Sequence, residues 1–187
     1  MNKTWARDCD KYFFILKYNS SLPSNITYEL NHSNIPILQP AYLVSDDYGR
    51  LAGKVFRSFQ AIYSKYNNYD WYLKADDDTF IFVDNLKKFL KTKNSTNPVT
   101  YGYDFKNLVE RGYHSGGAGY VLSNEALKRF HSKLSENYKY CRSSGAEDVQ
   151  IAKCLRKLGV YPDKSIDDEG RERFHLLGPN VHLKGKY

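Results

Sequence analysis

The chain lacks long apolar segments and internal repeats, and it has only three cysteines. Its longest uninterrupted apolar run covers residues 12–16, whereas a membrane-spanning helix needs about 20 such residues. These absences exclude a membrane span, a collagen, a coiled coil and a repeat array. With 41% apolar and 26% charged residues among 187, the sequence predicts one folded globular domain.

Positive charge and aromatic side chains are plentiful. The 28 Lys and Arg residues outnumber the 21 Asp and Glu residues, which gives a net charge of +7, and 16% of the residues are aromatic. A basic, aromatic-rich chain could bind nucleic acid through phosphates and bases. Sugars and nucleotides also bind to aromatic surfaces, so the composition leaves these ligand classes open.

Asparagine and cysteine residues indicate an oxidising compartment. The chain has five Asn-x-Ser/Thr sequons where its composition predicts about 1.6 by chance. These sequons begin at Asn2, Asn19, Asn25, Asn31 and Asn94. The excess favours a lumenal or secreted glycoprotein, although an Asn-rich chain also forms sequons by accident. Cys141 and Cys154 could form a disulfide, and Cys9 would then need a partner outside this chain.

Apolar periodicity predicts helices and strands in alternation. The expected helices cover residues 51–66, 85–93, 124–136 and 145–158, and the expected strands cover residues 12–17, 70–75, 99–102 and 120–122. Ser123 is expected to cap the third helix, and Ser144 with Glu147 forms a capping-box pattern at the fourth. This alternation favours an α/β sandwich with a mostly parallel sheet.

Three consecutive carboxylates, Asp76, Asp77 and Asp78, follow the expected strand 70–75. In open α/β sheets, ligands bind beyond the carboxyl ends of the strands. Alternate side chains of an extended segment share one side, so Asp76 and Asp78 can share a hard cation that relieves their repulsion. The alternative is an exposed acidic turn that caps the following helix. The position after a strand favours the metal site.

Three weaker patterns each have a functional and a structural interpretation. The glycine-rich residues 114–120 let the backbone approach a ligand closely, or they form a tight bulge. Asp148 follows Glu147 in the first turn of a helix, where the dipole favours an ionised general base, or it only stabilises that dipole. His182 could complete the ligand shell of a Mn²⁺-type ion, or it is an ordinary surface histidine.

Together these motifs resemble the core 1 β1,3-galactosyltransferases, which belong to the larger β1,3-glycosyltransferase family that includes the fringe enzymes. The resemblance spans nearly the whole chain, and its segments lie in the family's order. They are residues 3–9 (KTWARDC), 70–79 (DWYLKADDDT), 112–123 (GYHSGGAGYVLS) and 125–130 (EALKRF), the pair Glu147-Asp148, and residues 170–175 (GRERFH) with His182.

The resemblance implies a GT-A type fold, a nucleotide-sugar-binding sandwich that uses Mn²⁺ and UDP-galactose. The implied reaction is an inverting transfer of galactose to the 3-hydroxyl of O-linked N-acetylgalactosamine on glycoproteins. Asp78, supported by Asp76, would hold the metal with His182 and the two donor phosphates, which offsets charge on the departing diphosphate. Asp148 would deprotonate the acceptor hydroxyl.

The resemblance also assigns substrate contacts. They fall on Lys3, Trp5, Asp76, Asp77, Tyr113, Gly116, Gly117 and Glu147. Lys3 and Trp5 are expected near the nucleotide, and Tyr113 with the glycines is expected beside the donor and acceptor sugars.

The sequence departs from the family at both ends. Family members carry a membrane anchor, a stem and a first strand before the segment that corresponds to residues 3–9. The expectation is therefore a single catalytic domain over residues 1–187, incomplete at both ends and lacking its first strand, which would also carry a cysteine partner for Cys9. Val181 stands where the family usually has another histidine. The resemblance implies a type II membrane protein of the Golgi lumen, and it leaves a homodimer open.

Other functions remain as alternatives. A fringe-like β1,3-N-acetylglucosaminyltransferase would use the same metal and base with another donor sugar. An inactive truncated relative could act as a binding or chaperone protein, but the intact aspartate triplet favours an enzyme. A nucleic-acid partner is not expected, because only the net charge favours it.

Overall fold

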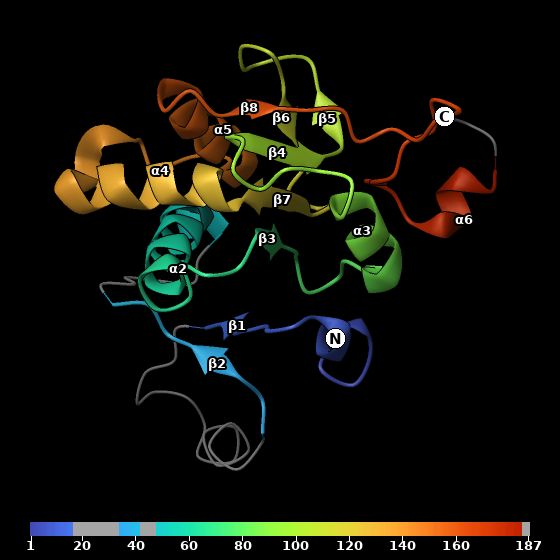
Figure 1. The fold of residues 1–187 in the computed structure, drawn as a ribbon, viewed down its shortest axis with the longest axis horizontal. Coiled ribbons are helices and arrows are strands. Elements are labelled where there is room, and N and C mark those ends of the chain that lie inside the picture. The colour runs from blue at the N-terminus through green and yellow to red at the C-terminus, as the bar shows by residue number, and fades with distance from the viewer. Residues whose placement is uncertain (17–33, 42–47, 185–187) are drawn as a thin grey trace.

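The computed structural model describes residues 1–16, 34–41 and 48–184. The helices are α2 (Leu51–Lys65), α3 (Val83–Leu90), α4 (Asn124–Glu136), α5 (Glu147–Lys157) and the short α6 (Pro179–His182), with 3-10 turns η1 (Trp5–Asp8), η2 (Tyr48–Arg50) and η3 (Tyr138–Tyr140). The strands are β1 (Phe14–Ile15), β2 (Ile37–Leu38), β3 (Trp71–Lys74), β4 (Val99–Gly102), β5 (Asp104–Phe105), β6 (Tyr113–His114), β7 (Tyr120–Ser123) and β8 (Tyr161–Pro162). The fold is therefore mixed α/β (Figure 1).

The central sheet has the strand order β3-β7-β4-β8. β7 runs antiparallel to both β3 and β4, and only β4 and β8 are parallel. The prediction of a mostly parallel sheet is therefore wrong for these strands. The chain reaches β7 through the paired strands β5 and β6 and a short glycine-rich loop, and antiparallel neighbours need no crossover helix.

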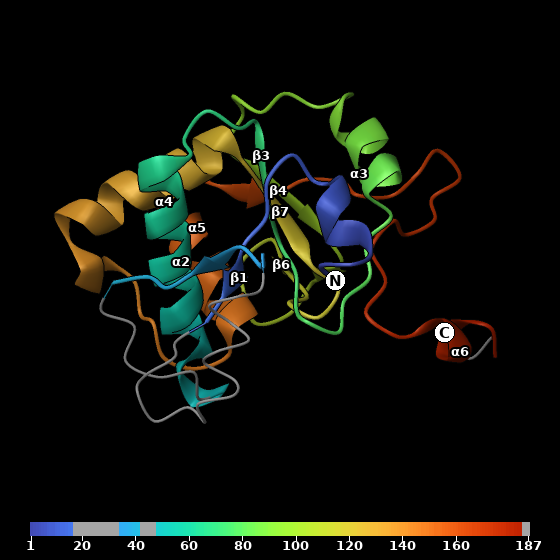
Figure 2. The ribbon, with the colours of Figure 1, turned by 90° about the horizontal axis from the view of Figure 1, so that it is seen from below.

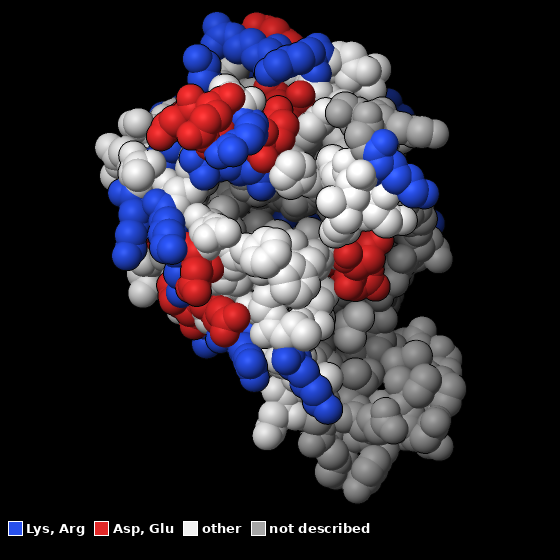
Figure 3. Space-filling model, turned by 90° about the vertical axis from the view of Figure 1, so that its right-hand side faces the viewer, with Lys and Arg blue, Asp and Glu red and all other residues white. Residues whose placement is uncertain are grey.

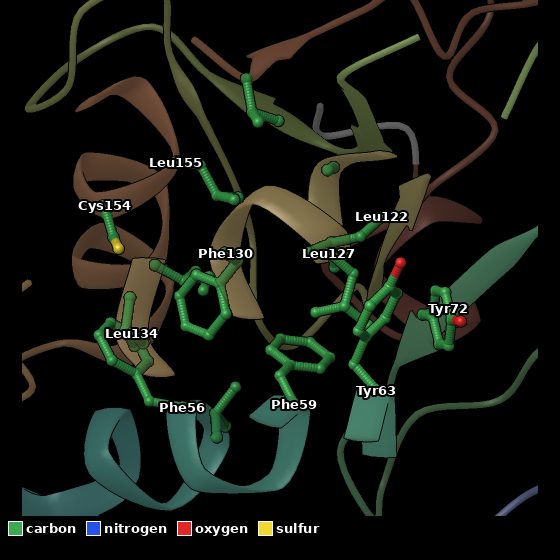
Figure 4. Packing of buried hydrophobic residues seen from close by; sticks show 14 of the residues in the cluster. Phe56, Phe59, Tyr63, Tyr72, Leu122, Leu127, Phe130, Leu134, Cys154 and Leu155 are labelled. Carbon is green, nitrogen blue, oxygen red and sulfur yellow. The ribbon is translucent and has the colours of Figure 1, made fainter. Parts of the chain in front are cut away.

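Helices and loops cover both faces of this sheet. Tyr120 and Leu122 of β7 belong to the cluster that α2, α4 and α5 build on one face, shown in Figure 4. Val121 belongs to the cluster on the opposite face, with Phe89 of α3. Successive strand residues point to opposite faces, so burial on both sides explains why every residue of β7 is buried.

Aromatic rings of α2 and α4 contact each other at the centre of the main core cluster. Phe130 meets the rings of Phe56 and Phe59 edge-on, with centroid distances of 5.1 and 6.2 Å. The predicted helix over residues 51–66 is confirmed as α2, whose apolar stripe makes this contact.

None of the described helices is long and apolar enough to cross a membrane.

The two predicted helix caps have different outcomes. The Ser123 hydroxyl accepts a hydrogen bond from the Ala126 amide at 3.1 Å, so the predicted cap of α4 is confirmed. The predicted capping box of α5 does not form, because its N-cap residue is Ala146 and no side chain caps it. Glu147 instead points into the core, where Tyr120 donates to it.

The disulfide that the sequence allowed between Cys141 and Cys154 is confirmed. Cys141 and Cys154 form a disulfide with a Cα–Cα distance of 5.3 Å, which ties the segment before α5 to that helix. Cys9 is the free cysteine of the described residues and is half-buried. Of the sequons, Asn19, Asn25 and Asn31 lie outside the described residues.

A cavity of about 1450 Å³ lies between β3 and β1. Residues 12–16 line one side of it and residues 70–78 the other. Among the described strands, β3 pairs only with β7 and β1 only with β2, so β1 lies apart from the central sheet (Figure 1). The predicted strand at residues 12–17 exists as β1, but it does not extend that sheet.

Replacing both Cys141 and Cys154 by alanine should lower the free energy of unfolding by about 2–3 kcal/mol. The cross-link spans 13 residues, and a link of this length restricts the unfolded chain by about that amount. Urea unfolding followed by circular dichroism measures the change. Cys9→Ala retains the disulfide and serves as the control. A double variant as stable as this control would contradict the prediction.

Candidate active site

The three aspartates lie directly after β3, in the segment 75–79 that we call the aspartate loop. Asp76 is half-buried, whereas Asp77 and Asp78 are exposed. The Thr79 hydroxyl accepts a hydrogen bond from the Asp76 amide at 3.2 Å and donates to the carbonyl of Gly117 at 2.9 Å. Thr79 therefore fixes the aspartate loop against residues 115–119, which we call the glycine loop.

Trp5 supports the aspartate loop from the N-terminal segment. Its indole Nε1 donates to the Thr79 carbonyl at 3.1 Å, and its buried ring packs with Ile81 and Val83. Trp5 and the three aspartates line the cavity between β1 and β3. Lys3 is exposed two residues before Trp5 and is not among the lining residues.

The glycine loop lies beside the carboxyl end of β3, because Tyr120 at the start of β7 pairs with Lys74. A Cβ at Gly119 would lie 3.1 Å from the Lys74 carbonyl oxygen, and its φ of +75° favours glycine. A Cβ at Gly116 would lie 3.1 Å from Oε2 of Glu147, whereas one at Gly117 would meet no atom within 4 Å. Close packing between elements therefore accounts for Gly116 and Gly119, whereas Gly117 has open space where a side chain would lie.

A buried ion pair lies where the two loops meet α5. The Lys74 ammonium is 2.5 Å from Oδ1 of Asp76 and 3.5 Å from Oε2 of Glu147. The side chains of Lys74 and Glu147 are only 10% and 3% exposed, and the Tyr120 hydroxyl donates to Glu147. Burial raises the pKa of Glu147, and the nearby Lys74 charge opposes that increase.

Asp148 lies at the edge of the glycine loop in the first turn of α5. Its Oδ2 accepts a hydrogen bond from the Gly116 amide at 3.3 Å, and its Oδ1 accepts one from the Val149 amide at 2.8 Å. Tyr113 is buried nearby with Val149 and Phe105. Burial, with a contribution from the Asp148 charge, raises the pKa of Tyr113. Gly116 is thus in contact both with Asp148 and with Lys74, the partner of Asp76 in the aspartate loop.

His182 is placed apart from these groups. It lies in α6, which both ribbon views show at the edge of the molecule (Figures 1 and 2). Its ring contacts that of His175 with a centroid distance of 4.8 Å. Within the described residues, no three His, Cys, Asp or Glu side chains are grouped so that they could hold a metal. The structure therefore does not bring His182 together with Asp76 and Asp78.

Charges of both signs alternate on the face shown in Figure 3. Lys and Arg lie beside Asp and Glu there, so this face carries no continuous basic surface. Nucleic-acid binding usually depends on such a surface.

Sequence reasoning missed Lys74, Thr79 and Tyr120 as parts of this site. Lys74 offered a usable signal, since it is a charged residue in a strand that covers the core and stands directly before a carboxylate triplet. A buried ammonium requires counter-charges, and Asp76 is one of the two that it finds. The role of Tyr120 depends on its burial against Glu147, which no local pattern indicates.

Alanine at Gly116 should destabilise the protein more than alanine at Gly117. The Gly116→Ala methyl would crowd Glu147 and Lys74, and such overpacking costs about 1–3 kcal/mol. Gly117→Ala is the matched control in open space, with an expected effect within about 0.5 kcal/mol. Thermal unfolding compares the two variants. Equal destabilisation would contradict the packing described for Gly116.

His114 should make stability depend on pH. It is buried beside the Thr100 hydroxyl, 2.9 Å from Nε2, and burial lowers its pKa to about 4 from an ordinary value of 6.5. The unfolded chain therefore binds a proton first as the pH falls, so stability should decrease from pH 6.5 to 4 by up to about 3 kcal/mol. Urea unfolding at several pH values should give a flatter profile for His114→Gln than for the wild type. Parallel profiles would exclude His114 as the source.

Comparisons with known proteins agree with the motifs. Residues 41–112 match the family model described as Galactosyltransferase. The chain is 40% identical over 74% of its length to glycoprotein-N-acetylgalactosamine 3-beta-galactosyltransferase 1 of Xenopus laevis. It is 30% identical over 57% of its length to human chondroitin sulfate synthase 3. It is 31% identical over 57% of its length to mouse N-acetyllactosaminide beta-1,3-N-acetylglucosaminyltransferase 4.

These matches cover only part of each relative. They span 38% of the frog protein, 13% of the human protein and 34% of the mouse protein. The family match contains the aspartate loop and ends at Gly112, just before the glycine loop. The resemblance that the motifs indicated is thereby confirmed: this chain is similar to the galactosyltransferases, and residues 41–112 match their family model.

Proposed function

We propose that this chain is part of an inverting transferase. It would move galactose from UDP-galactose to the 3-hydroxyl of O-linked N-acetylgalactosamine on glycoproteins. The observation that carries the proposal is the meeting of the aspartate loop, the glycine loop and the first turn of α5 around Lys74 and Gly116. The similarity to the frog galactosyltransferase supports the choice of donor and acceptor.

We propose Asp148 as the general base. Glu147 is committed to the buried pair with Lys74, whereas Asp148 is half exposed and is oriented by two main-chain amides. An acceptor hydroxyl that reaches Asp148 would give up its proton as its oxygen bonds to the anomeric carbon. The bond from that carbon to UDP breaks in the same step, on the opposite face.

We propose Mn²⁺ as the cofactor, held by Asp76 and Asp78 with oxygens of the donor phosphates. The carboxylates fit it chemically, because Asp78 is exposed, Asp76 is only half-buried, and hard oxygen donors suit this ion. When bound, the metal supplies charge neutralisation for the leaving diphosphate. The family resemblance assigns a third protein ligand to His182, whose ring contacts that of His175 in this structure.

The proposed substrate contacts differ in how directly they can act. Trp5 and Asp77 line the cavity beside the aspartate loop, where we propose that the nucleotide binds, with the exposed Lys3 near its phosphates. Gly117 is open to a sugar. Tyr113 is buried against Val149, which follows Asp148, and against Phe105, so we propose that it supports the base instead of touching a sugar.

The proposed activity also carries expectations for the whole protein. They are a GT-A type domain with a further strand between β1 and β3, a Golgi location and a membrane anchor outside the described residues. The cavity between the two strands supports the extra strand, because residues of both strands line it. Cys9 also lines this cavity, where a cysteine on that strand could reach it.

Asp148→Asn should lower kcat about 10²–10⁴-fold and leave UDP binding unchanged, since it removes only the base. The assay measures transfer from UDP-galactose to an O-GalNAc peptide with Mn²⁺. Asp84→Asn, at an exposed position of α3, is the control. Undiminished transfer by Asp148→Asn would reject this residue as the base.

Asp78→Ala should weaken Mn²⁺-dependent UDP binding at least about tenfold, because a hard-cation site loses one oxygen ligand. Calorimetric titration with UDP, with and without Mn²⁺, measures this effect, and unchanged binding would reject the metal site. In the transfer assay, turnover with UDP-N-acetylglucosamine alone would favour a fringe-like enzyme. UDP binding without turnover of either donor would indicate a binding protein.

A further inference from the structure

We propose that Lys74 is a positioning residue that sets the placement of Asp76 relative to Asp148. The inference rests on the proposed function, because those two carboxylates serve the donor side and the acceptor side of the reaction. Lys74 itself is nearly buried, so it would act through its neighbours and not by touching substrate.

The ammonium of Lys74 makes two hydrogen bonds and a further ion pair. It donates to Oδ1 of Asp76 at 2.5 Å and to the Gly116 carbonyl at 3.3 Å, and it lies 3.5 Å from Oε2 of Glu147. It also lies 5.8 Å from the centroid of the Tyr120 ring. These four partners come from the aspartate loop, the glycine loop, α5 and β7. One cation therefore joins all the elements that build the site.

The connection continues from Lys74 to the proposed base through Gly116. The carbonyl of Gly116 accepts from Lys74, and its amide donates to Oδ2 of Asp148. A Cβ at Gly116 would lie 3.4 Å from the Lys74 ammonium and 3.1 Å from Oε2 of Glu147, so Gly116 packs closely against the ion pair. A displacement of Lys74 would therefore move both the Asp76 carboxylate and the donor that orients Asp148.

The burial of the pair makes this arrangement stiff. A buried charge needs its counter-charges, and removing one partner leaves the other uncompensated. Lys74 is a point charge on a flexible stem, whereas arginine presents a planar fork that would hold the same two carboxylates in a different geometry. Arginine at position 74 would therefore keep the charge and change the geometry, whereas an uncharged side chain would remove the charge.

The test compares Lys74→Arg and the double variant Lys74→Met/Glu147→Gln with the wild type. The double variant removes the charges of Lys74 and Glu147 together, so Glu147 is not left as an unpaired buried carboxylate. Asp76 keeps its charge, and its side chain is 35% exposed to water. Lys128→Met, at an exposed position of α4 where the side chain is 61% exposed, is the matched control. Three properties are measured: hydrogen exchange in residues 115–119 and the first turn of α5, the Kd for UDP with Mn²⁺, and kcat with KM.

We expect both variants to fold and to exchange amide hydrogens in the glycine loop about tenfold faster than the wild type. Their kcat should fall at least about tenfold, while KM for the donor and the Kd for UDP with Mn²⁺ change less than about threefold. The carboxylate of Asp76 remains, so binding is retained and only the alignment with Asp148 is lost.

Other outcomes would overturn the inference. Unchanged exchange and unchanged kcat would show that Lys74 does not position the carboxylates. Equal losses in kcat and in UDP binding would indicate a general structural role. If the wild type transfers no galactose, the proposed function fails, but the exchange measurement still decides whether Lys74 holds the two loops and α5 together.

Discussion

The buried ammonium of Lys74 is the interaction on which the site depends. Asp76 and Glu147 both lie next to this ammonium, and their carboxylates would repel each other without it. The side chain of Glu147 is almost completely removed from water. The resulting network joins residues that are far apart in the chain. Because a buried charge tolerates no missing partner, the aspartate loop and the start of α5 have little freedom to move independently.

The antiparallel direction of β7 brings the two loops of this network to the same edge of the sheet. β7 begins where β3 ends, so the glycine loop that precedes β7 lies at the same edge of the sheet as the aspartate loop that follows β3. A parallel β7 would have put the glycine loop at the opposite edge. The direction of one strand therefore decides whether the two motifs can form a single site.

Local patterns predicted the elements well and their assembly poorly. The helix at α2 and the cap at Ser123 follow from periodicity and hydrogen-bonding chemistry within a few residues. Strand direction carries no such local signal, so the sheet was expected to be parallel. Glu147 was assigned to a cap for the same reason, because its actual partners, Lys74 and Tyr120, lie far away in the sequence. The local patterns also gave no sign that Lys74 pairs with both Asp76 and Glu147.

The glycine loop divides into positions with different freedom to change. Gly116 and Gly119 are enclosed by Glu147 and by the backbone of β3, whereas Gly117 faces open space. A larger side chain at position 117 would alter the shape of the site without disturbing its framework. Under the proposed function, position 117 is therefore where acceptor preference could change while the neighbouring glycines preserve the fold.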